Sequence, residues 1–250
     1  MKGFGVAGVT GRMGRLLAEE IAAAGLTFAG GSSRTANAAA FTDAASLAAA
    51  CDVLIDFTQA SAVQANAQAV IAAHCVWILG TSGLSSDDEA AVAEAAKHVA
   101  VVYAPNFSPG VNLALALAER MAAALPAESY DAEIVEMHHR QKVDAPSGTA
   151  IGLGRAVAKG RGVRLEDVSE SGRDGHTGAR KPGAIGFAAL RGGQVVGEHT
   201  LIFAGATEHI ALTHRAFDRR AFASGAIRAA QWALTQPPGL YSMLDVLNIA

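Results

Sequence analysis

Cysteine is scarce in this chain, and neither sign of charge is in large excess. The 250 residues include two cysteines, and no C-x-x-C or H-E-x-x-H spacing occurs, so we expect neither a disulfide framework nor a metal site. The formal net charge of -3 provides no basic field for collecting phosphates, and we expect no nucleic-acid partner. Composition therefore favours a soluble globular protein whose thiols behave as small buried hydrophobes.

Long apolar runs are also absent. No stretch approaches the roughly 20 apolar residues that span a bilayer, and the apolar N-terminal segment is interrupted by Gly8, Gly11 and Arg12. We therefore expect no membrane partner and no export, which predicts a cytoplasmic protein. With 51% hydrophobic and 17% charged residues, the chain can form one large core or two lobes of ordinary domain size.

The first part of the chain alternates short apolar runs with segments of helical period, as a parallel sheet wrapped by helices does. We predict strands at residues 4–7, 26–29, 53–57, 76–79 and 99–103. Gly25 is placed to end the first helix in a left-handed conformation, and Ser86 with Glu89 predicts a capping box at a later helix. The predicted fold class is α/β, with an N-terminal Rossmann-type, doubly wound parallel sheet in residues 1–108.

The pattern changes after Pro109. An alanine- and leucine-rich helix breaks at Pro126, and we predict strands at residues 132–137, 184–190, 195–203 and 210–214. Gly192-Gly193 favours an antiparallel hairpin between the second and third of these strands. Residues 109–217 are thus predicted to form a C-terminal α+β domain with a mixed, largely antiparallel sheet, and a helix in residues 218–250 returns the chain to the first domain.

A glycine-rich turn follows the first predicted strand and leads straight into a helix. It reads Gly8-Val9-Thr10-Gly11-Arg12-Met13-Gly14. Gly8 permits a tight turn, Gly11 allows a pyrophosphate to approach, and the helix start offers unpaired N–H groups at the positive end of the helix dipole. The spacing lacks the middle glycine of the usual fingerprint, and a purely structural turn is the alternative. We predict that these seven residues bind a dinucleotide.

Cofactor choice is normally set at the end of the second strand, where an acid binds the ribose hydroxyl of NAD. Here the chain reads Gly30-Gly31-Ser32-Ser33-Arg34, with no acid. Ser33 and Arg34 can instead bind a 2'-phosphate. We predict a preference for NADPH and leave the use of NADH open; a solvated Arg34 is the alternative.

Two further segments end predicted strands on the same rim of the sheet, where open α/β sheets bind their ligands. They are Gly80-Thr81-Ser82 and Ala104-Pro105-Asn106-Phe107. We predict that both segments surround the nicotinamide half of the cofactor, with Phe107 packing on that ring. Ordinary turns are the alternative.

The densest polar cluster follows the first strand of the second domain. It reads Glu136-Met137-His138-His139-Arg140-Gln141-Lys142-Val143-Asp144-Ala145-Pro146-Ser147-Gly148-Thr149. Its last four residues precede a helical period, so N–H groups near Gly148 and Thr149 can hold a carboxylate. Because neighbouring strand residues point to opposite faces, we expect the backbone to leave the β conformation at His138 and His139.

This cluster resembles the substrate signature of the dihydrodipicolinate reductases, and the glycine-rich turn resembles their nucleotide loop. The resemblance covers nearly the whole chain. It implies an NAD(P)H-dependent oxidoreductase that reduces a small cyclic dicarboxylate, 4-hydroxy-tetrahydrodipicolinate (dihydrodipicolinate), to tetrahydrodipicolinate in the diaminopimelate route of lysine biosynthesis. It also implies a homotetramer, with residues 1–108 binding the dinucleotide and residues 109–217 binding the substrate and the other subunits.

The resemblance further implies roles within the polar cluster. It makes His138 the proton donor, Lys142 a catalytic cation, and His139, Gly148 and Thr149 ligands of the substrate. Two positions depart from the family pattern: Gln141 stands where relatives often have another histidine, and the acid that many relatives carry before Arg34 is missing.

Two other functions stay open at this point. One is another two-domain NAD(P)-dependent amino-acid dehydrogenase, built on a similar nucleotide-binding topology. The other is a non-catalytic NADPH-sensing regulator. A regulator would keep the glycine-rich turn but would need neither the histidine pair nor the anion-binding helix start, and this chain has both.

Overall fold

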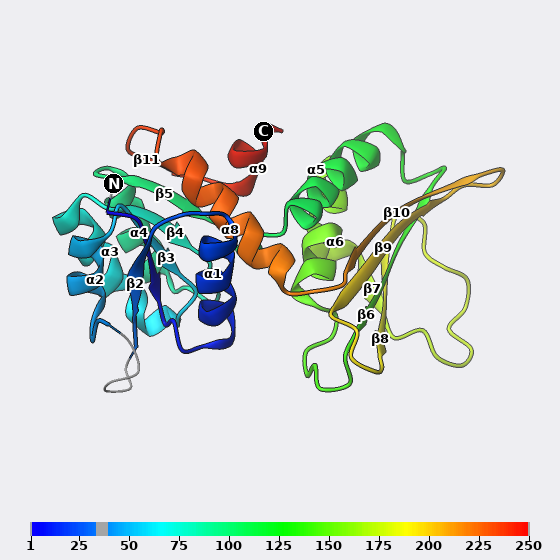
Figure 1. The fold of residues 1–250 in the computed structure, drawn as a ribbon. Helices are drawn as coiled ribbons and strands as arrows, with labels where there is room; N and C mark the ends of the chain where they lie inside the picture. The colour runs from blue at the N-terminus through cyan, green and yellow to red at the C-terminus, as the bar shows by residue number, and fades with distance from the viewer. Residues whose placement is uncertain (1, 34–39, 250) are drawn as a thin grey trace. The chain divides into compact units, whose positions relative to one another are not determined.

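The computed structural model describes residues 2–33 and 40–249. The chain divides into two compact units, Met1–Pro109 with Arg220–Ala250, and Gly110–Arg219. Each unit has its own sheet and is described by itself (Figure 1). Over the described residues, no helix combines the length and the apolar character needed to cross a membrane.

The first unit is a parallel sheet of six strands, in the order β11-β5-β4-β3-β1-β2. The strands are β1 Phe4–Ala7, β2 Phe28–Ser32, β3 Val53–Asp56, β4 Val76–Leu79, β5 Ala100–Tyr103 and β11 Gly239–Tyr241. The helices are α1 Arg12–Ala23, α2 Ala44–Ala50, α3 Val63–Ala73, α4 Ser86–Ala96, α8 Arg220–Ala233 and α9 Met243–Leu247, with a 3-10 turn at Ala60–Ala62.

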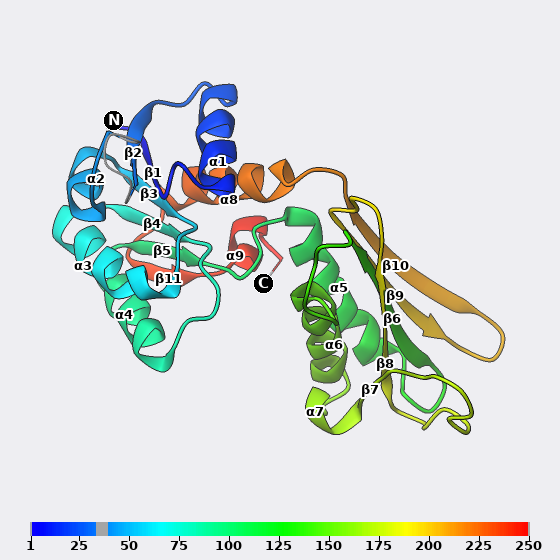
Figure 2. The same ribbon diagram turned by 90° about the horizontal axis from the view of Figure 1, so that it is seen from below.

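Neighbouring residues of these strands belong to two separate cores. Val53 and Ile55 of β3 pack with α1, α8 and α9, whereas Leu54 between them packs with α2, α3 and α4. A sheet covered on both faces needs strands that are apolar throughout, and every residue of β1 and β3 is buried. Figure 2 shows the two helical layers on opposite sides of the sheet. The predicted doubly wound parallel sheet is confirmed.

The second strand lies later than predicted. It spans Phe28–Ser32 instead of residues 26–29. Gly25 ends α1 with φ 67°, as predicted, and Leu26 still donates its N–H to the carbonyl of Ile21, so the strand begins beyond it. Its glycines are required by packing, because a Cβ on Gly31 would lie 2.4 Å from the Cβ of Val9.

The capping box of α4 is also shifted by one residue. Ser85 and Asp88 form it, instead of Ser86 and Glu89: the N–H of Asp88 donates to Ser85 Oγ at 3.3 Å, and the N–H of Ser85 donates to Asp88 at 3.0 Å. Both pairs have the right spacing, and the sequence does not reveal which serine keeps the extended backbone of a cap.

The second unit has a mixed sheet of five strands, in the order β10-β9-β6-β8-β7. The strands are β6 Asp131–His138, β7 Ser169–Ser171, β8 Ile185–Arg191, β9 Gly197–Ala204 and β10 His209–Ala216. The helices are α5 Pro109–Ala124, α6 Gly148–Gly160 and α7 Leu165–Val168. Side chains of β6 alternate between buried and partly exposed, and the buried apolar ones, Ala132 and Ile134, pack with α5 and α6. The helices therefore cover one face of this sheet, which matches the predicted α+β class.

The predicted hairpin at Gly192-Gly193 is wrong. Strands β8 and β9 do not pair; β6 lies between them, parallel to β8 and antiparallel to β9. The N–H of Gly192 donates to the carbonyl of His138, and the N–H of Arg140 donates to the carbonyl of Gly193. The segment between β8 and β9 is therefore hydrogen-bonded to the backbone at the end of β6. The antiparallel hairpin of this unit joins β9 to β10, where Ala204 pairs with His209.

Candidate active site

The glycine-rich turn connects β1 to α1 in the geometry that its glycines require. Gly8 has φ 70°, a left-handed conformation that favours glycine. A Cβ on Gly14 would lie 2.2 Å from the carbonyl oxygen of Gly8. The start of helix α1 therefore packs directly on the backbone of the glycine-rich segment before it. Gly11 caps α1 without any side-chain hydrogen bond. The helix start therefore presents backbone donors of the kind that bind phosphate.

The same turn lies beside the end of β2. The N–H of Val9 donates to the carbonyl of Ser32 at 3.0 Å, and the hydroxyls of Thr10 and Ser33 lie 3.1 Å apart. Two hydroxyl groups thus meet where a ribose substituent is expected. Arg34, the other residue predicted to bind a 2'-phosphate, lies outside the described residues. The Arg12 side chain is exposed, and Met13 packs on the core.

The ends of β3, β4 and β5 are joined by backbone hydrogen bonds. Gly80 donates its N–H to the carbonyl of Asp56 at 2.8 Å, and Ala104 donates to the carbonyl of Leu79 at 3.2 Å. The hydroxyl of Thr81 is buried and has no hydrogen-bond partner among the described residues. An orphaned buried hydroxyl at a strand end is a place for a ligand to bind.

Phenylalanine side chains fill the space under these strand ends. Phe107 is 1% exposed, and its ring centroid lies 5.3 Å from that of Phe57. A Cβ on Gly80 would lie 2.3 Å from the Phe57 ring, so glycine is needed there. The Phe107 ring therefore belongs to the core of the first unit. Pro105 and Ser82 are exposed on this rim, and Asn106 accepts the N–H of Ser108 at 2.8 Å.

The second group of functional side chains surrounds a buried carboxylate at the end of β6. Glu136 is 1% exposed and lies 2.6 Å from Nδ1 of His138. Arg191 of β8 donates to both of its oxygens at 2.8 Å, and the N–H of Ser147 donates to it at 3.1 Å. Burial opposes the charge on Glu136, but the hydrogen bonds from Arg191, His138 and Ser147 outweigh burial and leave its pKa below the usual value. Glu136 is therefore a carboxylate that accepts every one of these bonds.

His138 ends β6 and is held by one ring nitrogen. Because ionised Glu136 can only accept, Nδ1 carries the proton of this pair, and Nε2 is left to act on a ligand. Burial lowers the pKa of His138, while Glu136 opposes the shift. A Cβ on Gly197 of β9 would lie 3.0 Å from Nε2, so the glycine keeps space open beside that atom.

The start of α6 joins the same network. Ser147 caps the helix by accepting the N–H of Ala150, and its hydroxyl lies 2.9 Å from Nε2 of His199. The rings of His138 and His199 meet edge to face with centroids 5.0 Å apart, and burial lowers the pKa of His199 to about 4. A Cβ on Gly148 would meet nothing within 4 Å, so the helix start is open on that side.

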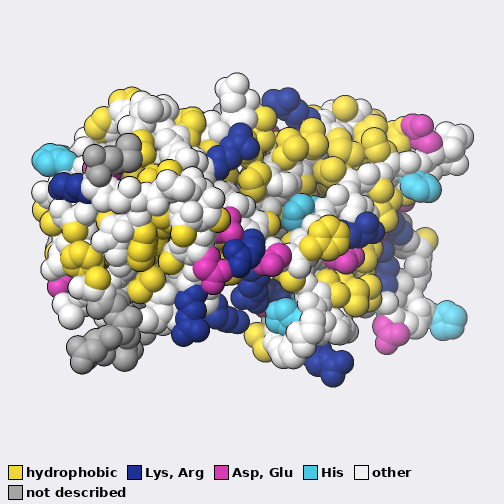
Figure 3. Space-filling model, in the orientation of Figure 1, with side chains coloured by type: hydrophobic (Ala, Val, Ile, Leu, Met, Phe, Trp, Pro, Cys, Tyr) yellow, Lys and Arg dark blue, Asp and Glu magenta, His cyan; other side chains and the backbone are white. Residues whose placement is uncertain are grey.

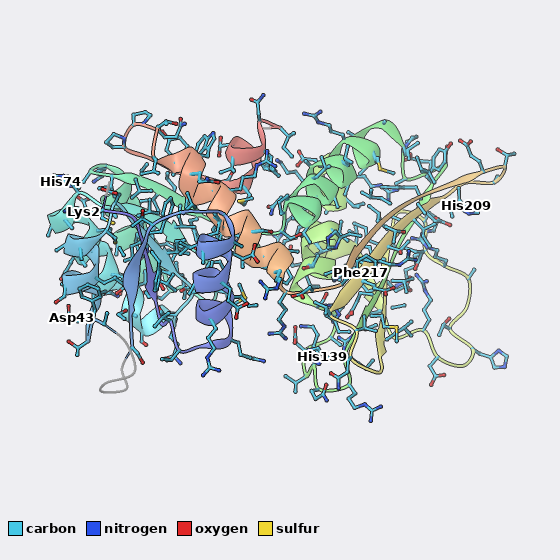
Figure 4. All side chains as sticks on the ribbon, viewed as in Figure 1. Lys2, Asp43, His74, His139, His209 and Phe217 are labelled. Atoms are coloured by element: carbon cyan, nitrogen blue, oxygen red, sulfur yellow. The ribbon has the colours of Figure 1, made fainter. Side chains whose placement is uncertain are left out.

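The loop after β6 holds the other predicted residues. The strand ends at His138, and the backbone turns at Arg140 and Gln141, as expected for a histidine pair that cannot share one face of a strand. Figure 4 labels His139 in this loop; its Nδ1 is buried without a hydrogen-bond partner in residues 2–33 and 40–249. Lys142 lies 2.9 Å from both carboxylate oxygens of Asp144.

The structure thus brings His138 and the helix start at Gly148 into one network, with Lys142 held nearby in the connecting loop by Asp144. Sequence reasoning gave no role to Arg191 or His199, which come from β8 and β9. Their signal was weak: each belongs to an ordinary strand pattern, and only the register of the sheet places them beside Glu136.

Charge is distributed without a dominant sign. On the face drawn in Figure 3, basic and acidic side chains lie in small groups of both signs, in keeping with the net charge of -3. Within the described ranges, no three His, Cys, Asp or Glu side chains are grouped as a metal site requires.

Comparison with known proteins gives one consistent result. The family described as "Dihydrodipicolinate reductase, N-terminus" matches residues 3–107, and "Dihydrodipicolinate reductase, C-terminus" matches residues 110–247. The 4-hydroxy-tetrahydrodipicolinate reductase of Granulibacter bethesdensis is 68% identical over 98% of this chain and 97% of its own length, and that of Acidiphilium cryptum is 57% identical over 98% and 97%. A dipicolinate-bound dihydrodipicolinate reductase from Paenisporosarcina sp. TG-14 has the same fold, with a TM-score of 0.79 at 22% identity, covering 99% of this chain and 98% of that one.

Proposed function

The chain belongs to the dihydrodipicolinate reductase family, and on that premise we propose how its parts divide the reaction. The enzyme is an oxidoreductase that uses a nicotinamide dinucleotide to reduce 4-hydroxy-tetrahydrodipicolinate in the diaminopimelate route of lysine biosynthesis. Residues 1–108 with 218–250 hold the dinucleotide, and residues 109–217 bind the cyclic dicarboxylate. The family match favours this activity over an amino-acid dehydrogenase or a non-catalytic regulator.

The observation that carries the assignment is the network around Glu136. His138, whose Nε2 has no hydrogen-bond partner among the described residues, lies next to an open helix start. One cation, Arg191, comes from the sheet, and a second, Lys142, comes from the loop after β6. A dicarboxylate needs donors for its oxygens, and its reduction needs an acid. The donors at the start of α6 and the acid His138 lie within one short stretch of chain.

The residues of the first unit fit a dinucleotide. Such a site is indicated by the start of α1, which no side chain caps, by the close packing at Gly14, and by the buried hydroxyl of Thr81, which has no partner among the described residues. The proposed cofactor-binding residues are Gly8, Val9, Thr10, Gly11, Arg12, Met13, Gly14, Ser33, Arg34, Gly80, Thr81, Ser82, Ala104, Pro105, Asn106 and Phe107. When bound, the cofactor supplies the hydride. Thr10 and Ser33 favour NADPH, because paired hydroxyls can donate to a 2'-phosphate and the sequence from Gly30 to Arg34 contains no acid to repel it.

In the second unit, residues bind the substrate and supply a proton. Backbone donors at Gly148 and Thr149, together with His139, hold the carboxylates. His138 donates the proton from Nε2, since Nδ1 is engaged by Glu136. Its lowered pKa makes it a stronger acid, and a bound dianion favours the charged ring that must form before transfer. Lys142 stabilises negative charge as it develops.

The test is a coupled assay with the upstream synthase, run with NADPH and with NADH. We expect kcat/KM to be higher with NADPH, and Arg34→Ala and Ser33→Ala each to lower the value for NADPH more than that for NADH. An NADH preference in the unmodified enzyme, together with no effect of Arg34→Ala on NADPH, contradicts the cofactor assignment while leaving the reaction class intact.

We also propose that the enzyme is a cytoplasmic homotetramer whose subunits meet through the second unit. Helices cover one face of its sheet, and the other face carries paired apolar residues, with Met137 opposite Leu190 and Val135 opposite Ala188. Leu190 is 51% exposed in the single chain. Light scattering after size-exclusion chromatography checks the assembly, and a monomer at micromolar concentration contradicts it.

A further inference from the structure

We propose that Glu136 is a positioning residue that couples proton donation to carboxylate binding, with its two oxygens holding the donor and the substrate anchor. The inference rests on the proposed function, because it takes His138 as the proton donor and the start of α6 as the anchor. Glu136 itself touches neither cofactor nor substrate and acts through its neighbours.

The two oxygens of Glu136 have different partners. Oε2 accepts from Nδ1 of His138 at 2.6 Å, and Oε1 accepts the N–H of Ser147 at 3.1 Å. Ser147 is the cap of α6, so fixing its N–H fixes the direction in which the following N–H groups at Gly148 and Thr149 point. One carboxylate therefore sets both the ring orientation of the acid and the direction of the anion-binding helix start.

Arg191 makes this arrangement possible. A carboxylate that is 1% exposed and unpaired would become neutral, and a neutral acid could not accept from both partners. Arg191 donates to both oxygens at 2.8 Å, a bidentate geometry that retains the charge. It also donates to the carbonyl of Asp144 at 2.6 Å, so the same guanidinium holds the loop that bears Lys142.

The charges facing His138 come from four segments. Glu136 lies on its own strand, Lys142 on the loop, Arg191 on β8, and His199 on β9. His199 is neutral at working pH, because its pKa is lowered to about 4, so it adds no repulsion. Glu136 is the one group of the four that favours the charged ring. Without its negative charge, Lys142 and Arg191 make protonation of His138 harder.

The experiment compares Glu136→Gln with Glu133→Gln. Glu133 is a matched control: it lies on the same strand, points to the other face of the sheet, and is likewise paired with arginine, in its case Arg173 and Arg180. Because that face is the proposed subunit contact, light scattering first establishes that Glu133→Gln keeps the assembly of the unmodified enzyme. Three quantities are measured on the full-length enzyme: kcat from pH 5 to 8, KM for the substrate, and the Kd of pyridine-2,6-dicarboxylate (dipicolinate) as a substrate-like probe.

We expect Glu136→Gln to lower kcat by roughly 10- to 100-fold. The pH at which kcat falls should move lower by about one unit, because the charged ring has lost its partner. The Kd of dipicolinate should rise at least about fivefold as the helix start loses its support. Glu133→Gln should leave all three quantities within about twofold. Arg191→Lys, which keeps the charge but not the bidentate geometry, should move them in the same direction as Glu136→Gln by smaller amounts.

A purely structural role gives a different result. If folded Glu136→Gln loses kcat without any shift of the pH profile and binds dipicolinate normally, the coupling is wrong. If Glu136→Gln does not fold, Arg191→Lys decides, and an unchanged profile and Kd for that variant overturn the proposal. Failure of the proposed function looks different again: the unmodified enzyme would not turn over, or His138→Gln would keep full kcat.

Discussion

His138 is subject to two opposing effects at the end of β6. Burial lowers its pKa, whereas the hydrogen bond to Glu136 and the charge of that carboxylate raise it. The balance lies below the ordinary value of 6.5, so the free enzyme has a largely neutral ring at neutral pH. An acid of this kind gives up its proton readily once it is charged, and its charged population grows as the pH falls.

The first prediction concerns the effect of His138 on kcat. His138→Gln should lower kcat by roughly 10²- to 10⁴-fold and change KM little, because a proton donor acts in the transition state. In the unmodified enzyme, kcat should fall as pH rises through the pKa of the donor in the complex. Steady-state kinetics from pH 5 to 8 measure both effects. Nearly full kcat in His138→Gln, with activity lost in His139→Gln, would mean that the two histidines have each other's roles.

The second prediction separates anchoring from proton transfer. We expect the hydroxyl of Thr149 to donate to the same carboxylate as the backbone N–H groups of the helix start. Thr149→Val removes this hydroxyl and should raise KM more than it lowers kcat, because an anchor binds substrate and transition state alike. Thr149→Ser keeps the hydroxyl and serves as the matched control, with KM close to that of the unmodified enzyme. A Thr149→Val enzyme whose kcat collapses at unchanged KM would assign the residue to the chemical step instead.

Among the individual site residues, the sequence revealed those that are close together along the chain. His138, His139, Lys142 and the helix start fall within a dozen positions, and their density of charge singles them out. Arg191 could not be found this way, because its partner Glu136 is 55 positions away and the pairing depends on the β6–β8 register. His199 likewise reaches Ser147 across 52 positions. Long-range pairs of this kind follow from strand order, which local patterns leave undetermined.

Among the elements, predictions succeeded where one turn type or period dominated. The turn from β1 to α1 was fully specified, because only glycine fits at Gly14, where a Cβ would collide with backbone. The hairpin at Gly192-Gly193 failed for the opposite reason. Two adjacent glycines fit a tight hairpin and a crossover equally well, and the hydrogen bonds to the end of β6 decide between them.

The third prediction tests the turn. Gly14→Ala should destabilise the protein by about 1–3 kcal/mol even though alanine is the better helix former, because the clash at 2.2 Å is with backbone that cannot move aside. The Kd for NADPH should rise with it. Gly152→Ala in α6 is the control, since its Cβ would meet only the flexible end of Leu115 at 3.3 Å. Urea unfolding measures the free energy of unfolding, and fluorescence titration measures the Kd for NADPH. Equal stability of the two variants would mean that the backbone between β1 and α1 can shift to accommodate a Cβ at little cost.

In the molecule as a whole, the histidines with lowered pKa values are unevenly distributed between the two units. Three buried or half-buried histidines have lowered pKa values, chiefly through burial: His138, His199 and His214. All three belong to the second unit. The two tryptophans, Trp77 and Trp232, both belong to the first unit. The two units can therefore be observed separately as pH changes.

The last prediction concerns acid stability. A histidine whose folded pKa lies below its unfolded value of about 6.5 stabilises the folded state above that pH, and the contribution is lost as pH falls from 6.5 toward the folded pKa. For His199, with a folded pKa of about 4, the full loss is about 3 kcal/mol. Carboxylates with lowered pKa values, such as Glu136, stabilise the folded state above their unfolded pKa of about 4.5, and most of that contribution is lost only as the pH falls below this value. The loss between pH 6.5 and 4.5 is therefore due to histidine and should appear in the second unit.

Urea unfolding at pH 7.0 and pH 5.0 measures this loss, with far-UV circular dichroism following both units and tryptophan fluorescence following the first. We expect the dichroism midpoint to fall more than the fluorescence midpoint on acidification. His199→Asn should be less stable at pH 7.0, because the bond to Ser147 is lost, yet its stability should depend less on pH. His209→Asn, which replaces an exposed histidine on β10 of the same sheet, should keep the pH dependence of the unmodified protein. If the free energy of unfolding of His199→Asn changes with pH as steeply as that of His209→Asn between pH 6.5 and 4.5, His199 is not the group that titrates.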